Sequence, residues 1–148
     1  MFKIEKAQFV MKKWGSEKIF SSNKLFAGKL LTVQKGCYCS LHSHPIKIEE
    51  FYVLKGSFEV QLLEGIAISE TSAKPTPNAK IKTVFLKKGD SLFINNGLFH
   101  RFIGTGSENI IIEVSTEDSS NDNVRIDPTY PNGCLNVDKL NVKIEKYK

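Results

Sequence analysis

Three histidines and one glutamate are the residues of this chain whose types and spacing suggest chemistry. His42, His44 and Glu49 lie within eight residues of each other in the stretch GCYCSLHSHPIKIEEFYVLKG, and His100 lies far downstream in GDSLFINNGLFHRF. The chain contains no further histidine. Imidazole nitrogens and a carboxylate together bind divalent metals and can leave coordination positions open for a substrate or water.

The spacing of His42 and His44 predicts that they lie on a β-strand. Side chains two residues apart leave the same face of an extended strand, whereas on a helix they would diverge by about 200°. Glu49 opens the segment EEFYVLKGSFEVQLL, whose alternation around Lys55-Gly56 is typical of a hairpin that turns at the glycine. An isolated H-x-H is most simply a chance pair of surface histidines, but the added carboxylate and the third histidine favour a metal site.

The same residues resemble the first sequence motif of the cupin superfamily. That motif consists of a glycine, five residues, H-x-H, three or four residues, a glutamate, six residues and a glycine. Its positions are occupied here by Gly36, His42, His44, Glu49 and Gly56. The resemblance implies an all-β fold, a single-domain cupin β-barrel of the jelly-roll type.

The second cupin motif is matched in part. Gly89, Gly97 and His100 stand at its two glycines and its histidine, but Asn95 replaces its proline and Gly104 its terminal asparagine. Asn and Gly residues can still form a tight turn, because both tolerate positive φ. The departures weaken the match of the turn and leave the match of the ligand intact.

By this resemblance, the metal ligands are His42, His44, Glu49 and His100. They would hold one divalent transition metal per chain. The ligand set suits Mn, Fe, Ni, Co or Zn, so the sequence leaves the metal open.

Composition indicates one globular domain. The chain has 148 residues, 41% hydrophobic and 25% charged, which is enough for a sizeable core. We expect a single cupin domain over 1–148, with a core at about 14–126 and a C-terminal extension at 127–148. No run of about 18 uncharged apolar residues occurs, so we expect a cytoplasmic protein without a membrane partner.

The net charge of +5 comes from lysines that are scattered rather than clustered with aromatic residues. This pattern favours a solvated surface over a nucleic-acid site. The surplus could attract anionic small molecules.

Three cysteines give an odd number, and Cys37 and Cys39 are too close on an extended strand for an easy disulfide. We therefore expect reduced, packed thiols. Cys37 and Cys39 have opposite parity to the histidine pair and should face away from the metal, unless a bulge intervenes.

Regularly spaced short segments separated by Gly, Asn and Lys turns independently suggest a β-sandwich or barrel. Glu64-Gly65 is expected to end the hairpin, and the segment ETSAKPTPNAK (70–80), with two prolines, to form an exposed loop rather than a lid. The expected strands are 11–20, 26–34, the hairpin 49–63, 81–86, 91–94, 100–103, 109–115 and 142–146.

A second resemblance concerns substrate class. The pieces WGSE, GKLL, CSLHSH, FYVLKG and EVST followed by VRI are similar to the sugar-directed cupins, including the cupin part of type II mannose-6-phosphate isomerase and related sugar isomerases. This similarity runs from about Trp14 to about Ile126. It implies a sugar or sugar phosphate substrate and interconversion of aldose and ketose, in which a metal stabilises the enediolate formed when a proton leaves the carbon beside the carbonyl.

Lys47 is the candidate catalytic residue. It lies two residues before Glu49 on the ligand strand, where it could orient a sugar oxygen, or transfer a proton if burial lowers its pKa. The competing interpretation is a solvent-facing loop residue.

Arg125, in NVRIDPTY, is the candidate substrate-binding residue, because a guanidinium can fork two oxygens of a phosphate or carboxylate. A structural salt bridge to Asp122 or Asp127 would explain it equally well. Arg101 follows His100 directly and should project to the opposite face, as a structural or interface residue.

Other functions remain open, because one fold hosts many. The same ligands loaded with iron could give a dioxygenase, and a metal site that binds a sugar without turning it over would make the protein a binding module. Metal-free epimerisation of nucleotide-linked sugars fits less well, since those cupin-like enzymes lack the full ligand set.

Exposed strand edges and an entry strand near Trp14 lead us to expect a homodimer, with the N-terminal strand adding to a partner's sheet. The resemblance to the cupins also implies a homodimer.

Overall fold

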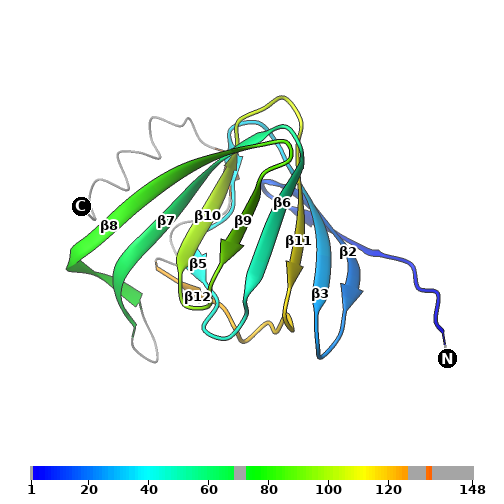
Figure 1. The fold of residues 1–148 in the computed structure, drawn as a ribbon, viewed down its shortest axis with the longest axis horizontal. Coiled ribbons are helices and arrows are strands. Elements are labelled where there is room, and N and C mark those ends of the chain that lie inside the picture. Colours follow the sequence, from blue (N-terminus) through cyan, green and yellow to red (C-terminus); the bar gives the residue numbers. More distant parts are fainter. Residues whose placement is uncertain (1, 69–72, 127–132, 135–148) are drawn as a thin grey trace.

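The fold is built of strands alone throughout the part of the chain that the computed structural model describes, residues 2–68, 73–126 and 133–134 (Figure 1). In those ranges no helix is present that could span a membrane. The strands are β1 (Gln8–Lys12), β2 (Gly15–Ser22), β3 (Ala27–Val33), β4 (Cys37–Tyr38), β5 (His42–Ser43), β6 (Glu49–Lys55), β7 (Ser57–Ile68), β8 (Ala73–Lys87), β9 (Ser91–Ile94), β10 (Phe99–Gly104), β11 (Asn109–Ser115), β12 (Val124–Arg125) and β13 (Gly133–Cys134).

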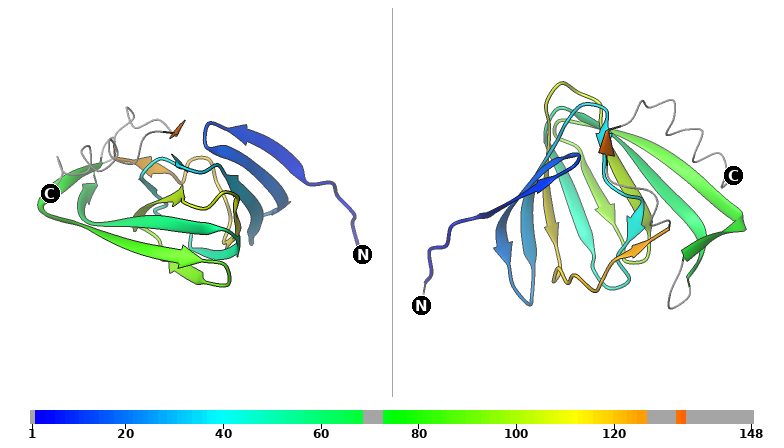
Figure 2. Two further views of the ribbon diagram at one scale, coloured as in Figure 1. Left: turned by 90° about the horizontal axis from the view of Figure 1, so that it is seen from above. Right: turned by 180° about the vertical axis from the view of Figure 1, so that it is seen from behind.

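Two antiparallel sheets form the barrel. The first sheet has the order β1-β2-β3-β11-β6-β9. The second has the order β12-β5-β10-β4-β13, and β7 pairs with β10 on its other side and with β8. Strand β11 therefore lies between β3 and β6, and β10 beside β5, so that segments far apart in the sequence lie side by side (Figure 2).

The core lies between the two sheets and follows the period-two alternation of the strands. Leu31 of β3, Phe51 and Val53 of β6, and Ile111 of β11 point inward from the first sheet. They meet Phe58, Val60 and Phe102 of the second sheet, together with Trp14 between β1 and β2. The Trp14 ring packs edge-on against Phe102 at a centroid distance of 5.6 Å.

The hairpin predicted over 49–63 is confirmed at its turn but is wrong at its end. Strand β6 ends at Lys55 and β7 begins at Ser57, with Gly56 at φ 78°. Strand β7 does not stop at Glu64-Gly65, however, because the register shifts there and pairing with β8 continues to Ile68. Gly65, at φ 77°, forms a bulge, which one glycine allows without ending the strand.

The exposed loop expected over 70–80 is wrong for residues 73–80, which belong to β8; residues 70–72 lie outside the described ranges. Pro75 pairs opposite Ile66. Strand β8 lies at the edge of the second sheet, where a proline costs no ladder hydrogen bond on the solvent side. The long β7–β8 hairpin projects from the barrel (Figure 1).

The remaining strand predictions hold in part. Strands β3, β9, β10 and β11 confirm those expected over 26–34, 91–94, 100–103 and 109–115, and 81–86 lies within β8. The single opening strand is instead a hairpin of β1 and β2. The strand expected over 142–146 lies outside the described residues, and the division into a core and an extension stays a prediction.

The cysteines correct the expectation of three reduced thiols. Cys37 and Cys134 form a disulfide across 97 residues, where β13 pairs with β4. Such a pairing depends on the tertiary fold and leaves no local sign in the spacing of cysteines. Cys39 is a free, buried thiol as expected, and burial raises its pKa to about 12.

Candidate functional site

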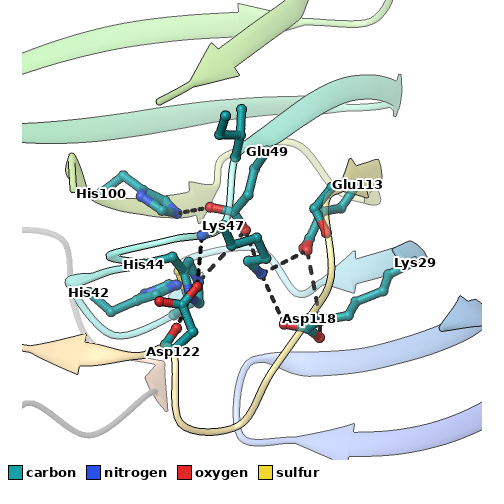
Figure 3. A network of polar contacts seen from close by, with 12 residues as sticks. Lys29, His42, His44, Lys47, Glu49, His100, Glu113, Asp118 and Asp122 are labelled. Carbon is teal, nitrogen blue, oxygen red and sulfur yellow. Dashed lines mark hydrogen bonds and ion pairs between the residues drawn. The ribbon is translucent and has the colours of Figure 1, made fainter. Parts of the chain in front are cut away.

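The four predicted ligands converge at one cavity of about 370 Å³ between the two sheets (Figure 3). Its apolar wall is formed by Trp14, Leu31, Phe51 and Phe102. Volumes of this size are typical of small-molecule sites that combine an apolar wall with a few convergent polar groups.

Strand pairing places the histidines. His42 in β5 stands directly opposite His100 in β10, so both side chains leave the same face, and their ring centroids are 4.7 Å apart. His44 follows one residue beyond β5, and its ring centroid lies 5.0 Å from that of His42. The predicted shared face of the H-x-H pair is therefore confirmed, although regular strand covers only His42–Ser43. Glu49 enters from the other sheet as the first residue of β6.

Each histidine is held by its Nδ1 atom. Nδ1 of His42 donates to the Ser40 carbonyl at 2.7 Å, Nδ1 of His100 to the Leu98 carbonyl at 3.0 Å, and Nδ1 of His44 to the Asp122 carbonyl. Because a carbonyl oxygen only accepts, these bonds place the proton on Nδ1. The Nε2 atoms of all three rings thus carry their lone pairs, which is the tautomer that ligates metals.

Two acceptors face each other at the centre. Oε2 of Glu49 lies 3.2 Å from Nε2 of His100, and Oε1 lies 3.7 Å from Nε2 of His44. Glu49 Oε2 and His100 Nε2 are buried without a hydrogen-bond partner. A cation between them would relieve both lone pairs, so the donor set fits a metal chemically. As the side chains stand, no three His, Cys, Asp or Glu groups among the described residues are spaced as ligands of one ion.

The protonation states agree with such a role. Burial lowers the pKa of His42, and the neighbouring His100 and His44 lower it further; burial likewise lowers the pKa of His44. Burial alone would raise the pKa of the Glu49 carboxyl, but its neighbours outweigh this effect, and the Lys47 ammonium at 2.8 Å holds the pKa well below its usual value. Neutral imidazoles beside an ionised carboxylate are the forms that bind metal.

Lys47 lies in the cavity wall and is only 3% exposed, which excludes the alternative of a solvent-facing loop residue. Its Nζ atom is 2.8 Å from Glu49 Oε1, 3.2 Å from Asp118 Oδ1 and 3.3 Å from Glu113 Oε1. Burial would lower the pKa of Lys47, but Glu113, Glu49 and Asp118 outweigh it and raise the pKa. The ammonium form can orient a substrate oxygen but cannot act as a base.

The sequence analysis missed three charged residues of the site, Lys29, Glu113 and Asp118, and named a fourth, Asp122, only as a possible salt-bridge partner of Arg125. Lys29 contacts Asp118, and its Nζ lies 3.7 Å from Glu113 Oε1. Lys29 in AGKLLTV and Glu113 in NIIIEVS stand at inward positions of apolar strands. That parity was a usable signal, because a buried charge needs a partner or a function.

Asp122 anchors the segment between His44 and Glu49 through hydrogen bonds. Its carboxylate accepts the backbone N–H groups of Ile46 at 2.9 Å and Lys47 at 2.7 Å, and its carbonyl accepts Nδ1 of His44. A residue 75 or more positions downstream thus sets the path of the chain between His44 and Glu49.

Arg125 also reaches the cavity. It stands opposite His42 in the pairing of β12 with β5, and its exposed side chain lines the cavity mouth. The expected alternative, a salt bridge to Asp122, is not formed within the described ranges, because that carboxylate holds backbone amides; Asp127 lies outside them.

The expected orientation is found for Arg101 but not for Cys39. Arg101 is buried as a structural residue, donating to Gln61 at 2.7 Å and lying over the Tyr38 ring. Cys39 was expected to face away from the histidines but lines the cavity, because residues 39–41 between β4 and β5 do not continue the strand alternation.

Solved structures similar to this chain establish the fold class. KdgF from Halomonas sp. has 18% identity and a TM-score of 0.56, over 72% of this chain and 81% of that one. The capsular polysaccharide assembling protein CapF from Staphylococcus aureus has 17% identity and a TM-score of 0.65, over 82% of this chain and 34% of that one. Oxalate decarboxylase from Bacillus subtilis, a protein with Mn(II) centres, has 16% identity and a TM-score of 0.64, over 80% and 30%. The chain thus spans about a third of the latter two. At these identities the likeness shows the fold, and the predicted cupin β-barrel is confirmed.

A match to a family model places the chain in one family within this fold class. Residues 7–141 match the family model of D-lyxose isomerase, so the chain belongs to the D-lyxose isomerase family. The resemblance to sugar-directed cupins is confirmed at that level, while a specific kinship with mannose-6-phosphate isomerase is not shown. No individual curated protein sequence matches the chain.

Replacing Asp122 by alanine should lower the free energy of unfolding by roughly 2–4 kcal/mol, because the buried Lys47 amide and the Ile46 amide lose a charged acceptor. Chemical denaturation monitored by circular dichroism measures the change. The exposed neighbour Asn121, replaced by alanine, is the matched control and should change stability little. Equal stability of the two variants would contradict the fastening role of Asp122.

Proposed function

We propose that this protein is a metal-dependent aldose–ketose isomerase that acts on a sugar or sugar phosphate. One observation carries the proposal: three histidines, each held through Nδ1, line a cavity of small-molecule size together with Glu49, and the Nε2 atoms of His44 and His100 lie 3.7 Å and 3.2 Å from its carboxylate oxygens. Membership of the D-lyxose isomerase family supports the reaction class. D-Lyxose and D-mannose share their configuration at C2, C3 and C4, so lyxose, mannose and mannose 6-phosphate are the first candidate substrates.

The proposed metal ligands are His42, His44, Glu49 and His100, which bind through three Nε2 atoms and one carboxylate. The bound metal would polarise the carbonyl and hydroxyl oxygens of the open-chain sugar. Mn, Fe, Ni, Co and Zn all suit these donors, and the Mn(II) centres of the similar oxalate decarboxylase make Mn the first metal to test.

Lys47 is proposed to orient the substrate. Its ammonium stands beside Glu49 and carries a raised pKa, so it remains a hydrogen-bond donor at neutral pH. A donor that is fixed by three carboxylates is preorganised to stabilise negative charge on a sugar oxygen.

The deciding experiment combines elemental analysis of the purified protein with a proton-exchange assay by NMR in heavy water. Deuterium entering C2 of D-lyxose, D-mannose or mannose 6-phosphate, in a sample with about one metal per chain, is the expected result. Metal without exchange of any aldose would contradict the isomerase and leave an oxygen-dependent enzyme or a binding module.

The double variant His42→Ala/His100→Ala should lose stoichiometric metal while its far-UV circular dichroism stays that of a β-protein. The physical reason is that two of the three imidazole donors are removed from a wall of the barrel that other side chains support. Arg125→Ala, which alters the cavity mouth without touching the four donors, should keep the metal. A double variant that still holds one metal per chain would refute the ligand assignment.

Arg125 is proposed to bind an anionic substituent of the substrate. For a sugar phosphate, Arg125→Ala should raise KM about 10–100-fold, because hydrogen bonds to charged groups contribute about 1.5–3 kcal/mol. The KM for the neutral sugar should change little. Steady-state kinetics on both substrates measures the split, with the exposed Lys88→Ala as a control remote from the cavity. An equal effect on both sugars would contradict phosphate recognition.

We also propose a homodimer through the outer face of the first sheet. Large apolar side chains on this face are 39–71% exposed: Phe9, Met11, Phe20, Tyr52, Leu54, Phe93 and Val114. Patches of this extent mark association surfaces. The N-terminal segment before β1 runs away from the barrel, and Phe2 and Ile4 are almost fully exposed (Figure 1). In the proposed dimer these two side chains would contact the second copy.

Placing charges in this face should separate the dimer. The variant Phe93→Lys/Val114→Lys is expected to elute as a monomer in size-exclusion chromatography with light scattering, because two buried ammonium groups would have to be desolvated. Phe85→Lys, an exposed aromatic position on β8 of the other sheet, should remain dimeric. A monomeric wild type would exclude the homodimer.

A further inference from the structure

The cavity holds a second buried carboxylate, Glu113, that takes no part in the proposed metal shell. It lies on β11, opposite Phe51 of β6, and shares its inward parity with Ile111. Glu113 is 6% exposed and lines the same cavity as the histidines. In Figure 3 it stands on the side of Lys47 away from the histidines.

The charges around Glu113 leave it the least tightly paired carboxylate of the cluster. Three carboxylates, those of Glu49, Glu113 and Asp118, share the two ammonium groups of Lys29 and Lys47. The shortest contact of Lys47 is to Glu49, at 2.8 Å, and that of Lys29 is to Asp118. Glu113 Oε1 lies farther from both, at 3.3 Å from Lys47 and 3.7 Å from Lys29.

The pKa shifts of the ionisable groups that line the cavity differ in direction. Burial raises the pKa of Glu113, and this outweighs the opposing effect of Lys29 and Lys47; Glu49 and Asp118 add to the rise. Glu49 shifts the other way and Lys47 stays protonated. A group that both accepts and returns a proton works best with a pKa near the working pH; the shift of Glu113 is toward neutral pH, whereas those of Glu49 and Lys47 are away from it.

We propose that Glu113 carries the proton between C2 and C1 of the sugar. This rests on the proposed isomerase function and names the residue that performs its central step. Glu113 lies beside the metal-ligand cluster but separate from it, with Lys47 between the two carboxylates.

In this step one proton moves from C2 to C1 by way of Glu113, and the electron pairs of the substrate shift accordingly. The Glu113 carboxylate takes the proton from C2, the C–H electron pair becomes the C1=C2 double bond, and the carbonyl pair of C1 moves onto O1. The hydroxyl proton of O2 passes to O1. The electron pair of O2 then forms the C2 carbonyl, the double-bond pair takes the proton back from Glu113 at C1, and the carboxylate is restored.

The test is Glu113→Gln, which keeps the size of the side chain and removes its proton-accepting capacity. Deuterium exchange at C2 of the aldose that exchanges in the wild type should fall about 10²–10⁴-fold, the contribution of general acid–base catalysis. Metal content should stay at the wild-type value, and the dissociation constant of the same aldose, measured by NMR titration, should stay within about threefold. Glu113→Asp should recover part of the rate.

The pH profile supplies a second readout that a purely structural role would not move. The charged groups facing Glu113 are Lys29 from β3, Lys47 before β6, Glu49 of β6 and Asp118 after β11. Since Lys29 favours the ionised form of Glu113, Lys29→Gln raises the pKa of Glu113, and the acid limb of the exchange rate should move to higher pH.

The outcomes separate this proposal from the function on which it rests. If the metal-loaded wild type exchanges no aldose, the isomerase function fails. If the wild type exchanges and folded Glu113→Gln exchanges equally fast, Glu113 is not the proton carrier. An acid limb that stays in place in folded Lys29→Gln would also overturn the assignment.

Discussion

The burial of Glu49 between a lysine and two histidine nitrogens is the constraint on which the rest of the site depends. A carboxylate that is 2% exposed needs compensation, because an isolated buried charge is costly. Lys47 supplies one partner at 2.8 Å, while His100 presents an acceptor at 3.2 Å. The Glu49 carboxylate is therefore paired with an ammonium on one side and faces imidazole nitrogens on the other.

The compensation extends through the wall of the barrel. Lys47 is held by Asp118 and Glu113 as well as by Glu49, and Lys29 closes the cluster from β3. The segment after β11 therefore also supports the site, since it carries Asp118 and Asp122. A cluster of alternating charges in a low-dielectric cavity is costly to assemble, but once formed it is preorganised for charge that develops on a substrate.

The parts of the site that sequence analysis found are those with local signatures. Regularly spaced short segments indicated a sandwich or barrel, alternation around Lys55-Gly56 indicated a hairpin, and the parity of His42 and His44 indicated a shared face. The boundaries that failed were those where context overrides propensity: Gly65 bulges a strand instead of ending it, and the prolines of 73–80 sit on an edge strand.

By itself the sequence determined the types and spacing of the candidate ligands and the β-class of the fold, because these follow from residue chemistry and a period of two along the chain. Only the tertiary structure decided which distant residues meet. His100 faces His42 through strand register, Glu113 reaches Lys47 across 66 residues, and Cys37 meets Cys134 across 97. The physical reason is that register between strands far apart in sequence is set by closure of the whole barrel, which no local pattern encodes.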